Sequence, residues 1–226
     1  DPSQRTAANR FFCLTCWGKI TLLSVPSCPV CGSPFPSEAA LSHSPEHLCG
    51  ECREDPPYFS RAITPYRYEG ALAKAIQLLK YERQVVLATS LAALLTTKLA
   101  PLELYLVTAI PLHVSKLRQR EFNQSLLVAK EVSRCLAKPL AVDVMTRNCE
   151  TKPQVGLSKK ARQKNMRHVF SIHRQKKIFG KRILLIDDVY TTGATLKEAA
   201  KTLIKAGAQE VIVAAPARML LNGPLI

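Results

Sequence analysis

The chain has 226 residues, 47% of them hydrophobic, which is enough for one α/β domain with a small appendage and excludes a disordered chain. No apolar run approaches the roughly 20 residues of a membrane-spanning helix, and no signal-peptide pattern occurs, so we expect a cytoplasmic protein. The net charge of +15 is uneven, with eleven Lys or Arg residues and no Asp or Glu between Thr151 and Arg182. This segment predicts a polyanionic partner, a diphosphate or a nucleic acid, although a solvated basic surface would have the same composition.

Three Cys-x-x-Cys pairs lie near the start of the chain. They are Cys13 and Cys16, Cys28 and Cys31, and Cys49 and Cys52. In a reducing compartment such repeats indicate structural zinc, which takes four thiolates. The segment is too short and Pro-rich for a core of its own, so the metal supplies folding energy. We therefore expect a zinc-binding element with a linker in residues 1–60 and the main domain in residues 61–226.

Six thiols exceed one zinc site by two, and two assignments remain open. We favour the first and second pairs, because the eleven-residue connection between them closes at a lower entropy cost than the seventeen-residue connection that follows. The third pair would then need another pair, upstream of Asp1. The competing assignment joins the second and third pairs in a zinc-ribbon spacing. His43 and His47 near the third pair are alternative ligands, but we interpret them as loop residues.

Hydrophobic periodicity predicts the elements of the main domain after a Pro-rich linker. The predicted helices cover residues 70–81, 85–99 and 125–136, with a short basic helix at 158–168. The predicted strands cover residues 64–68, 105–110, 140–144 and 169–172. The alternation of strand and helix from residue 105 onward predicts a doubly wound, mostly parallel sheet that binds its ligand at the carboxyl ends of the strands.

The most informative stretch is residues 183–195. Four branched apolar residues predict a buried strand at 183–186, and the adjacent acids Asp187 and Asp188 follow where it ends. A helix is predicted next, with Thr195 and Glu198 as a capping box and Gly207 as its end, before a second strand at 211–215. Backbone N–H groups at a helix N-terminus bind phosphate, and a flexible glycine and threonine hydroxyls favour this. Paired carboxylates beside a phosphate indicate sugar hydroxyls or a shared Mg²⁺ ion, and therefore a ribose 5-phosphate ligand.

This stretch resembles the phosphoribosyl diphosphate (PRPP) signature of type I phosphoribosyltransferases. In that family the acidic pair holds the ribose hydroxyls and the threonine-rich loop holds the 5-phosphate. The resemblance implies that PRPP binds together with Mg²⁺, and that Asp187 and Asp188 contact the sugar, with a general-base role as the catalytic alternative. The implied PRPP-binding residues are Asp187, Asp188, Val189, Thr191, Thr192, Gly193, Ala194 and Thr195.

Two further groups of basic residues suit a diphosphate. Lys116, Arg118 and Arg120 lie after a predicted strand and before a predicted helix, and arginine offers a planar fork of donors to phosphate oxygens. Asn123 would fix this connection or cap the following helix, and we expect a structural role for His113. A mobile flap that excludes water is expected within residues 151–168. Its candidate residues are Lys159, Lys160, Arg162 and Asn165.

The whole chain is similar to the ComF family, named for competence proteins of DNA-transforming bacteria. The resemblance rests on Cys-Pro-Val-Cys-Gly at 28–32, Leu-Leu-Lys-Tyr at 78–81, Pro-Leu-His at 111–113, Arg-x-Phe-Asn-Gln at 120–124, Thr-x-Pro-Gln-x-x-Leu at 151–157, Arg-x-x-Asn at 162–165 before Phe170, and residues 183–195. Three positions depart from the family pattern: Glu121 replaces a glycine, residues 166–169 replace small residues, and Tyr190 replaces a smaller aliphatic residue.

The resemblance implies a PRPP-binding protein of natural competence that handles incoming single-stranded DNA with DNA-uptake proteins. An active phosphoribosyltransferase of nucleobase or nucleotide metabolism and a non-catalytic PRPP sensor remain alternatives. Catalysis would displace Mg-diphosphate from the anomeric carbon through an oxocarbenium-like transition state. The sequence identifies neither the acceptor nor the oligomeric state.

Overall fold

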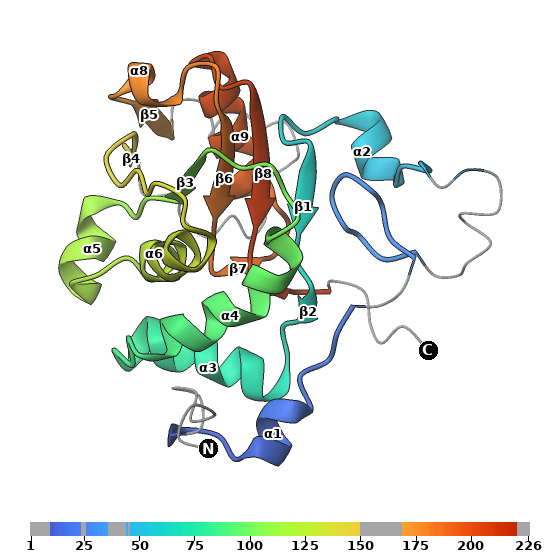
Figure 1. Ribbon diagram of the computed structural model, residues 1–226, viewed down its shortest axis with the longest axis vertical. Coiled ribbons are helices and arrows are strands. Elements are labelled where there is room, and N and C mark those ends of the chain that lie inside the picture. The colour runs from blue at the N-terminus through green and yellow to red at the C-terminus, as the bar shows by residue number, and fades with distance from the viewer. Residues whose placement is uncertain (1–9, 24–25, 36–43, 45, 150–168, 221–226) are drawn as a thin grey trace.

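A four-stranded parallel sheet forms the centre of the computed structural model, which describes residues 10–23, 26–35, 44, 46–149 and 169–220 (Figure 1). The strand order is β1-β8-β6-β3, with β1 at Arg61–Ile63, β8 at Glu210–Ala214, β6 at Arg182–Ile186 and β3 at Leu106–Ala109. In register, Leu184 of β6 pairs with Val107 of β3 and with Ile212 of β8. Parallel neighbours need long crossovers, and helices supply them between β3, β6 and β8.

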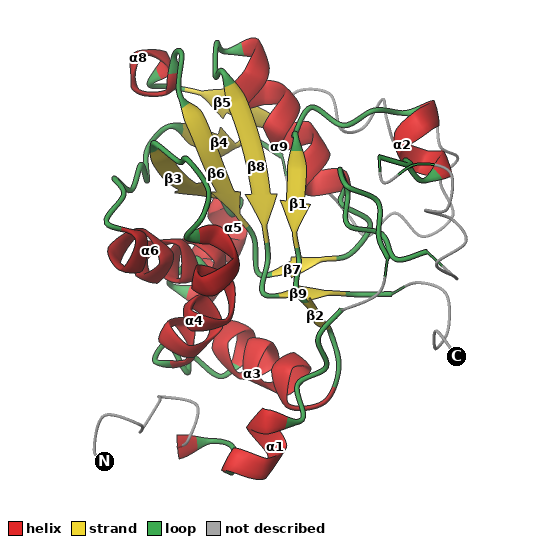
Figure 2. Cartoon of the chain, turned by 45° about the vertical axis from the view of Figure 1, so that its right-hand side comes forward, coloured by secondary structure: helices red, strands yellow, loops and turns green. Residues whose placement is uncertain are grey.

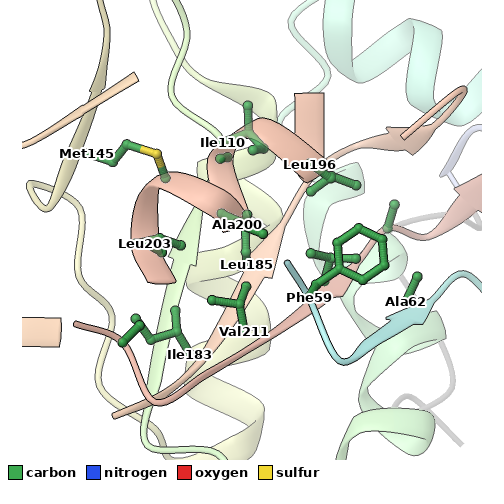
Figure 3. Packing of buried hydrophobic residues seen from close by; sticks show 14 of the residues in the cluster. Phe59, Ala62, Ile110, Met145, Ile183, Leu185, Leu196, Ala200, Leu203 and Val211 are labelled. Atoms are coloured by element: carbon green, nitrogen blue, oxygen red, sulfur yellow. The ribbon is translucent and has the colours of Figure 1, made fainter. Parts of the chain in front are cut away.

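The two faces of this sheet are both apolar, because successive side chains of a strand point to opposite sides. Ile183 and Leu185 lie in the cluster of buried residues that includes Leu196, Ala200 and Leu203 of α9 (Ala194–Lys205), as Figure 3 shows. Leu184 and Ile186 lie in the opposite cluster, with buried residues of α3 (Gly70–Tyr81), α4 (Leu87–Leu99) and α6 (Gln124–Leu136) (Figure 2). The sheet is therefore covered on both sides, as the predicted doubly wound fold requires.

Two smaller sheets flank the main one. The first is parallel, in the order β2-β9-β7, and its strands Tyr66–Arg67, Ala217–Arg218 and Val189–Tyr190 follow the carboxyl ends of β1, β8 and β6. The second pairs β4 (Met145–Arg147) with β5 (Phe170–Ile172) in antiparallel fashion. The short helices are α1 (Leu14–Gly18), α2 (Gly50–Glu54), α5 (Val114–Arg120) and α8 (Gln175–Ile178). None of the helices in the described ranges has the length and apolar run of a membrane crossing.

The structure confirms the main helices and corrects several local predictions. Helix α3 has the predicted bounds, and α9 ends at Lys205 just before Gly207, whose φ is +95°. The expected linker at 53–62 instead runs into β1, and the strand predicted at 64–68 shortens to β2 because Thr64 and Pro65 separate the two. The strand predicted at 140–144 is reduced to an isolated bridge from Leu140 to Val107, and β4 starts later. The helix predicted at 158–168 lies outside the described residues.

The capping box predicted for Thr195 and Glu198 is wrong. Helix α9 begins two residues earlier than this box requires, at Ala194, with Gly193 in the N-cap position and φ at +74°. Glycine adopts this left-handed conformation without steric cost, so the chain turns into the helix before Thr195 is reached. Thr195 consequently lies inside the first turn, and the helix start is left without a side-chain cap.

Candidate functional site

The acidic pair lies where β6 leaves the sheet, at the edge where strand carboxyl ends meet. Asp188 accepts hydrogen bonds from Gln124 Nε2 at 3.1 Å and pairs with Lys80 Nζ at 2.6 Å. Asp187 Oδ1 accepts hydrogen bonds from Ser125 Oγ at 2.8 Å and from the backbone N–H of Asp188 at 2.9 Å. Three elements, α3, α6 and the end of β6, thus converge on two carboxylates.

The two acids differ in their electrostatic surroundings. Burial, reinforced by the neighbouring Asp188 carboxylate, raises the pKa of Asp187 to about 7, although the Ser125 hydroxyl opposes this. Burial acts to lower the pKa of Lys80, but the Asp188 carboxylate outweighs burial and raises it. Lys80 therefore stays protonated and compensates Asp188, while Asp187 remains the acid whose ionisation is disfavoured.

The loop after the acids has the geometry of an anion site. Thr191 and Thr192 are exposed, Gly193 is buried, and Thr195 is half-buried in the first turn of α9. Gly193 carries no side chain to cap the helix, and Thr192 Oγ1 accepts only a long hydrogen bond from Ala194 N–H, at 3.4 Å. Backbone N–H groups at the start of a twelve-residue helix therefore face outward with their partial positive charge. Val189, also predicted to contact PRPP, lies half-buried in β7 between the acids and this loop.

The basic residues predicted for the diphosphate lie on α5, a helix that sequence reasoning did not place there. Arg120 at its last turn donates a hydrogen bond from Nη1 to Gln124 Oε1 at 3.1 Å, and Gln124 in turn reaches Asp188. Lys116 and Arg118 lie earlier on the same helix. The arrangement joins Arg120 to the acidic pair through one amide side chain, and it leaves Lys116 and Arg118 as predicted contacts only.

Glu121, which replaces a family glycine, closes α5 in the left-handed conformation at φ +68°. Its carboxylate pairs with Arg83 at 3.0 Å. A glycine at this position would adopt the same left-handed backbone conformation without steric cost. His113 caps α5 by accepting a hydrogen bond from Ser115 N–H. Asn123 caps α6 by accepting hydrogen bonds from Ser125 and Leu126 N–H.

The structure describes only the part of the basic segment that follows residue 168. The flap candidates Lys159, Lys160, Arg162 and Asn165 lie outside the described residues. Farther along, Asp143 pairs with Arg174 at 2.5 Å and Lys177 at 3.0 Å, and Arg182 pairs with Glu103 and Glu210. Acids distant in the sequence therefore neutralise part of the charge excess between residues 151 and 182.

Four cysteines form a metal-binding cluster at the edge of the main sheet. The Sγ atoms of Cys28, Cys31, Cys49 and Cys52 all lie within 4.8 Å of one another. A tetrahedral zinc site with Zn–S bonds near 2.3 Å separates its sulfurs by roughly 3.8 Å, and the Cys31 and Cys49 sulfurs are 3.6 Å apart. Burial raises the pKa of Cys31 to about 12, while backbone N–H donors outweigh burial and lower the pKa of Cys28 to about 7. The donor set fits a closed, structural zinc ion.

The favoured assignment of the first and second pairs was therefore wrong, and the competing assignment describes the structure. Closing a seventeen-residue rather than an eleven-residue loop costs only about 0.4 kcal/mol more, which packing easily exceeds. Cys28, Cys31 and Cys52 are buried in the cluster that contains Phe59 and α9. Cys13 and Cys16 are exposed on α1, whose surroundings, including Trp17, pack against the opposite cluster.

Sequence reasoning missed three partners of the acidic pair: Lys80, Ser125 and Gln124. Lys80 belongs to the Leu-Leu-Lys-Tyr motif at 78–81, and Gln124 closes the motif at 120–124, so both had a signal in the family resemblance. Ser125 had none. It lies at the predicted start of a helix, where serine normally indicates only capping.

Comparisons with known families define the class of protein. A phosphoribosyl transferase domain model matches residues 123–220, and a double zinc ribbon domain model matches residues 3–53. Among solved structures, the chain is similar to glutamine PRPP amidotransferase from B. subtilis, with a TM-score of 0.44 and 20% identity over 63% of this chain and 30% of that one. It is also similar to purine phosphoribosyltransferase from Pyrococcus horikoshii, with a TM-score of 0.38 and 20% identity over 58% and 80% of the two chains. The two matched domain models and the parallel sheet, which is covered on both faces, define a type I phosphoribosyltransferase-like α/β domain with an N-terminal zinc ribbon.

Curated relatives narrow this class to one family. The chain is 33% identical to competence protein F of Haemophilus influenzae over 214 residues, covering 91% of this chain and 90% of the relative. It is 33% identical to DNA utilization protein YhgH of Escherichia coli K12, covering 82% and 81%, and 24% identical to competence protein ComFC of Bacillus subtilis, covering 86% and 78%. The chain belongs to the ComF family.

The four-cysteine cluster predicts which thiols retain metal. Replacing Cys52 by serine removes one thiolate from a buried site and should reduce bound zinc by about one equivalent per chain, because structural zinc needs four ligands. The matched control Cys135→Ser changes an exposed thiol outside the cluster and should leave zinc content unchanged. Atomic absorption on both purified variants measures this, and equal zinc content in the two would contradict the assignment.

The raised pKa of Asp187 predicts a pH-dependent stability in the ligand-free protein. Because the folded state holds this proton more tightly than the unfolded chain, Asp187 stabilises the fold below about pH 4, and this contribution is lost as pH rises through about 7. Asp187→Asn removes the buried charge and keeps the shape. Its unfolding free energy, measured with urea, should rise relative to wild type from pH 4 to pH 8.

Asp143→Asn provides a control of opposite sign. The hydrogen bond from Lys177 lowers the pKa of the exposed Asp143, so this acid stabilises the fold above its ordinary pKa and loses that contribution in acid. Asp143→Asn should therefore be less stable than wild type at pH 7, with a smaller difference at acidic pH. A difference between Asp187→Asn and wild type that is constant from pH 4 to pH 8 would contradict the placement of Asp187.

Proposed function

We propose that this protein binds PRPP with Mg²⁺, or a related ribose phosphate, at the carboxyl end of β6 and acts in natural competence by handling incoming single-stranded DNA. One observation carries the ligand assignment. Two carboxylates lie directly before an uncapped helix start, at the sheet edge where α/β proteins bind ligands. Carboxylates accept hydrogen bonds from sugar hydroxyls, and the N–H groups of residues 192–194 suit a phosphate.

The hydrogen bonds of the acidic pair support the binding of a neutral diol at these carboxylates. Lys80 and Gln124 hold Asp188, and Ser125 holds Asp187 through a hydroxyl. A ribose hydroxyl donates the same kind of hydrogen bond as Ser125 does, so a sugar satisfies these carboxylates without adding charge. The 5-phosphate carries negative charge, and the start of α9 favours an anion.

The competence role is supported by the relatives named competence protein F and DNA utilization protein, which share more than four fifths of their length with this chain. It is supported also by the net charge of +15, which favours association with a polyanion. Cytoplasmic DNA-uptake proteins are the partners that such a role requires. The segment from residue 151 to residue 168, which includes the flap candidates, supplies six of the basic residues that would face the strand.

An active phosphoribosyltransferase is the second candidate, and Arg120 favours it. Its guanidinium is linked through Gln124 to Asp188, and a planar fork of donors near the sugar site suits a departing diphosphate. In this mechanism Asp187 or Asp188 orients the ribose hydroxyls or accepts a proton. A Mg²⁺ ion bound with PRPP would neutralise negative charge on the departing diphosphate. Release of diphosphate on adding nucleobases or amines would distinguish an enzyme from a PRPP sensor.

Calorimetric titration tests ligand binding. We expect wild type to bind Mg-PRPP, and the double variant Asp187→Asn with Asp188→Asn to bind at least about 100-fold more weakly, because hydrogen bonds to charged groups contribute about 1.5–3 kcal/mol each. Asp143→Asn is the matched control, since it removes a carboxylate remote from the site. Equal affinity in the double variant and the control would defeat the assignment.

Salt dependence tests DNA binding. If the basic residues between 151 and 168 contact phosphates, the affinity for a single-stranded oligonucleotide should fall steeply with salt, by a slope of about 0.7 per phosphate contact on a logarithmic plot. Lys159→Gln with Lys160→Gln should reduce this slope, while Lys177→Gln, which removes a cation already paired with Asp143, should leave it nearly unchanged. A flat salt response in wild type would remove DNA phosphates from the proposal.

A further inference from the structure

Arg218 is a buried cation that lies between the zinc cluster and the loop at residues 191–193. We call this loop, the proposed phosphate site, the phosphate loop. It belongs to β9 and is only 5% exposed. Its Nε donates a hydrogen bond to Thr64 Oγ1 at 2.9 Å, and its Nη2 donates to the backbone carbonyl of Cys31. Within the described residues, no carboxylate forms an ion pair with Arg218. Burying an unpaired charge is costly, so its surroundings must supply compensation.

The zinc cluster can supply that compensation. A zinc ion held by four thiolates has an excess of negative charge, and Cys31, one of the four cysteines, presents its carbonyl to Arg218. Gly32, the next residue, leaves room for the guanidinium: a Cβ at this position would meet Arg218 Nη2 at 3.4 Å, and φ is +70°. The turn at Cys28–Gly32, which we call the metal knuckle, therefore contacts this cation directly.

The other side of Arg218 faces the phosphate loop. Its guanidinium carbon lies 3.9 Å from the centroid of the Tyr190 ring, a cation–π contact in a buried setting. Tyr190 is itself buried, and β7 pairs it directly with Arg218 of β9. Its ring packs so closely on Gly193 that a Cβ added there would overlap the ring and its hydroxyl. Tyr190 therefore supports the residue at which the chain turns into α9.

A second contact ties the same two regions together. Lys197, in the first turn of α9, donates to Glu51 at 2.8 Å and lies 3.8 Å from Asp55. Glu51 belongs to α2, the helix that carries Cys52. Both the loop and the helix that follows it thus contact segments that carry cysteines of the metal cluster.

We propose that Arg218 and Tyr190 are positioning residues that make the ribose-phosphate affinity of the loop depend on zinc in the four-cysteine site. This inference rests on the proposed function of the loop. With zinc bound, the knuckle fixes the Cys31 carbonyl, Arg218 stays stacked on Tyr190, and the ring holds Gly193 in place. Without zinc, the knuckle relaxes, Arg218 loses its compensation, and the support under Gly193 is released.

The coupling has a reciprocal consequence that can be measured on the zinc-loaded protein. If zinc strengthens ligand binding by a given factor, the ligand must strengthen zinc binding by the same factor. Saturating ribose 5-phosphate should therefore raise the zinc affinity, measured by equilibrium competition with a coloured chelator, by about tenfold if the coupling has the usual size. Ribose 5-phosphate is the probe because its single phosphate competes weakly for zinc.

Three variants test whether Arg218 couples the zinc site to the phosphate loop. Arg218→Met removes the cation and keeps an apolar chain, so ribose 5-phosphate should no longer raise the zinc affinity. Arg218→Lys should retain part of the effect. The control Lys201→Ala removes a different contact, that of the Lys201 ammonium with the Tyr58 ring, and should keep the full effect. An undiminished rise in zinc affinity in Arg218→Met, or no rise in a wild type that binds the ligand, would overturn the proposal.

Hydrogen exchange separates this proposal from the proposed function. Zinc removal should raise exchange at residues 190–196 in wild type without any ligand, and a loop whose exchange ignores zinc would overturn the coupling. If wild type fails to bind ribose 5-phosphate and PRPP, the proposed function fails while this readout still decides the coupling. Should Arg218→Met not fold, Tyr190→Leu is the alternative variant, because it keeps Arg218 and its contacts with the metal knuckle. Hydrogen exchange at residues 190–196 of this variant should become independent of zinc. A retained dependence on zinc would contradict coupling through Tyr190.

Discussion

The placement of two adjacent carboxylates at the end of β6, with Asp188 buried and Asp187 partly buried, is the constraint on which the rest of the site depends. Charges removed from water must be paired or hydrogen-bonded, and the chain brings Lys80 from α3 and Ser125 and Gln124 from α6 to do this. These contacts fix how α3 and α6 pack on one face of the sheet near the acids. Burial and the Asp188 charge nevertheless raise the pKa of Asp187 to about 7. Shifted pKa values of this kind cluster at functional sites.

The opposite face of the sheet is organised around the zinc ribbon. Cys28, Cys31 and Cys52 share one apolar cluster with α9, so the metal knuckle is part of the core. The backbone N–H of Ala62 donates to the Val30 carbonyl at 2.7 Å, which covers the free edge of β1 and protects it from pairing with another chain. The zinc ribbon and the loop before α9 consequently share the same packing, and a change in one is expected to reach the other.

The β6–α9–β8 unit was predictable from sequence because its signals are local: an apolar strand, small loop residues, a helical stripe and Gly207. The capping box failed because Gly193, with its left-handed φ, starts α9 before Thr195. The partners of the acids were not predictable from residue patterns, since Lys80 reaches Asp188 only through tertiary packing of α3. The zinc assignment failed for a related reason, because loop entropy is a small term beside the burial of Cys28 and Cys52.

The most direct test of the central claim is a crystal structure with Mg-PRPP bound. We predict that the 5-phosphate lies against the backbone N–H groups at the start of α9. We also expect both ribose hydroxyls to donate hydrogen bonds to Asp187 and Asp188. A ligand bound elsewhere, with the start of α9 empty and both acids still occupied solely by Lys80, Ser125 and Gln124, would contradict it.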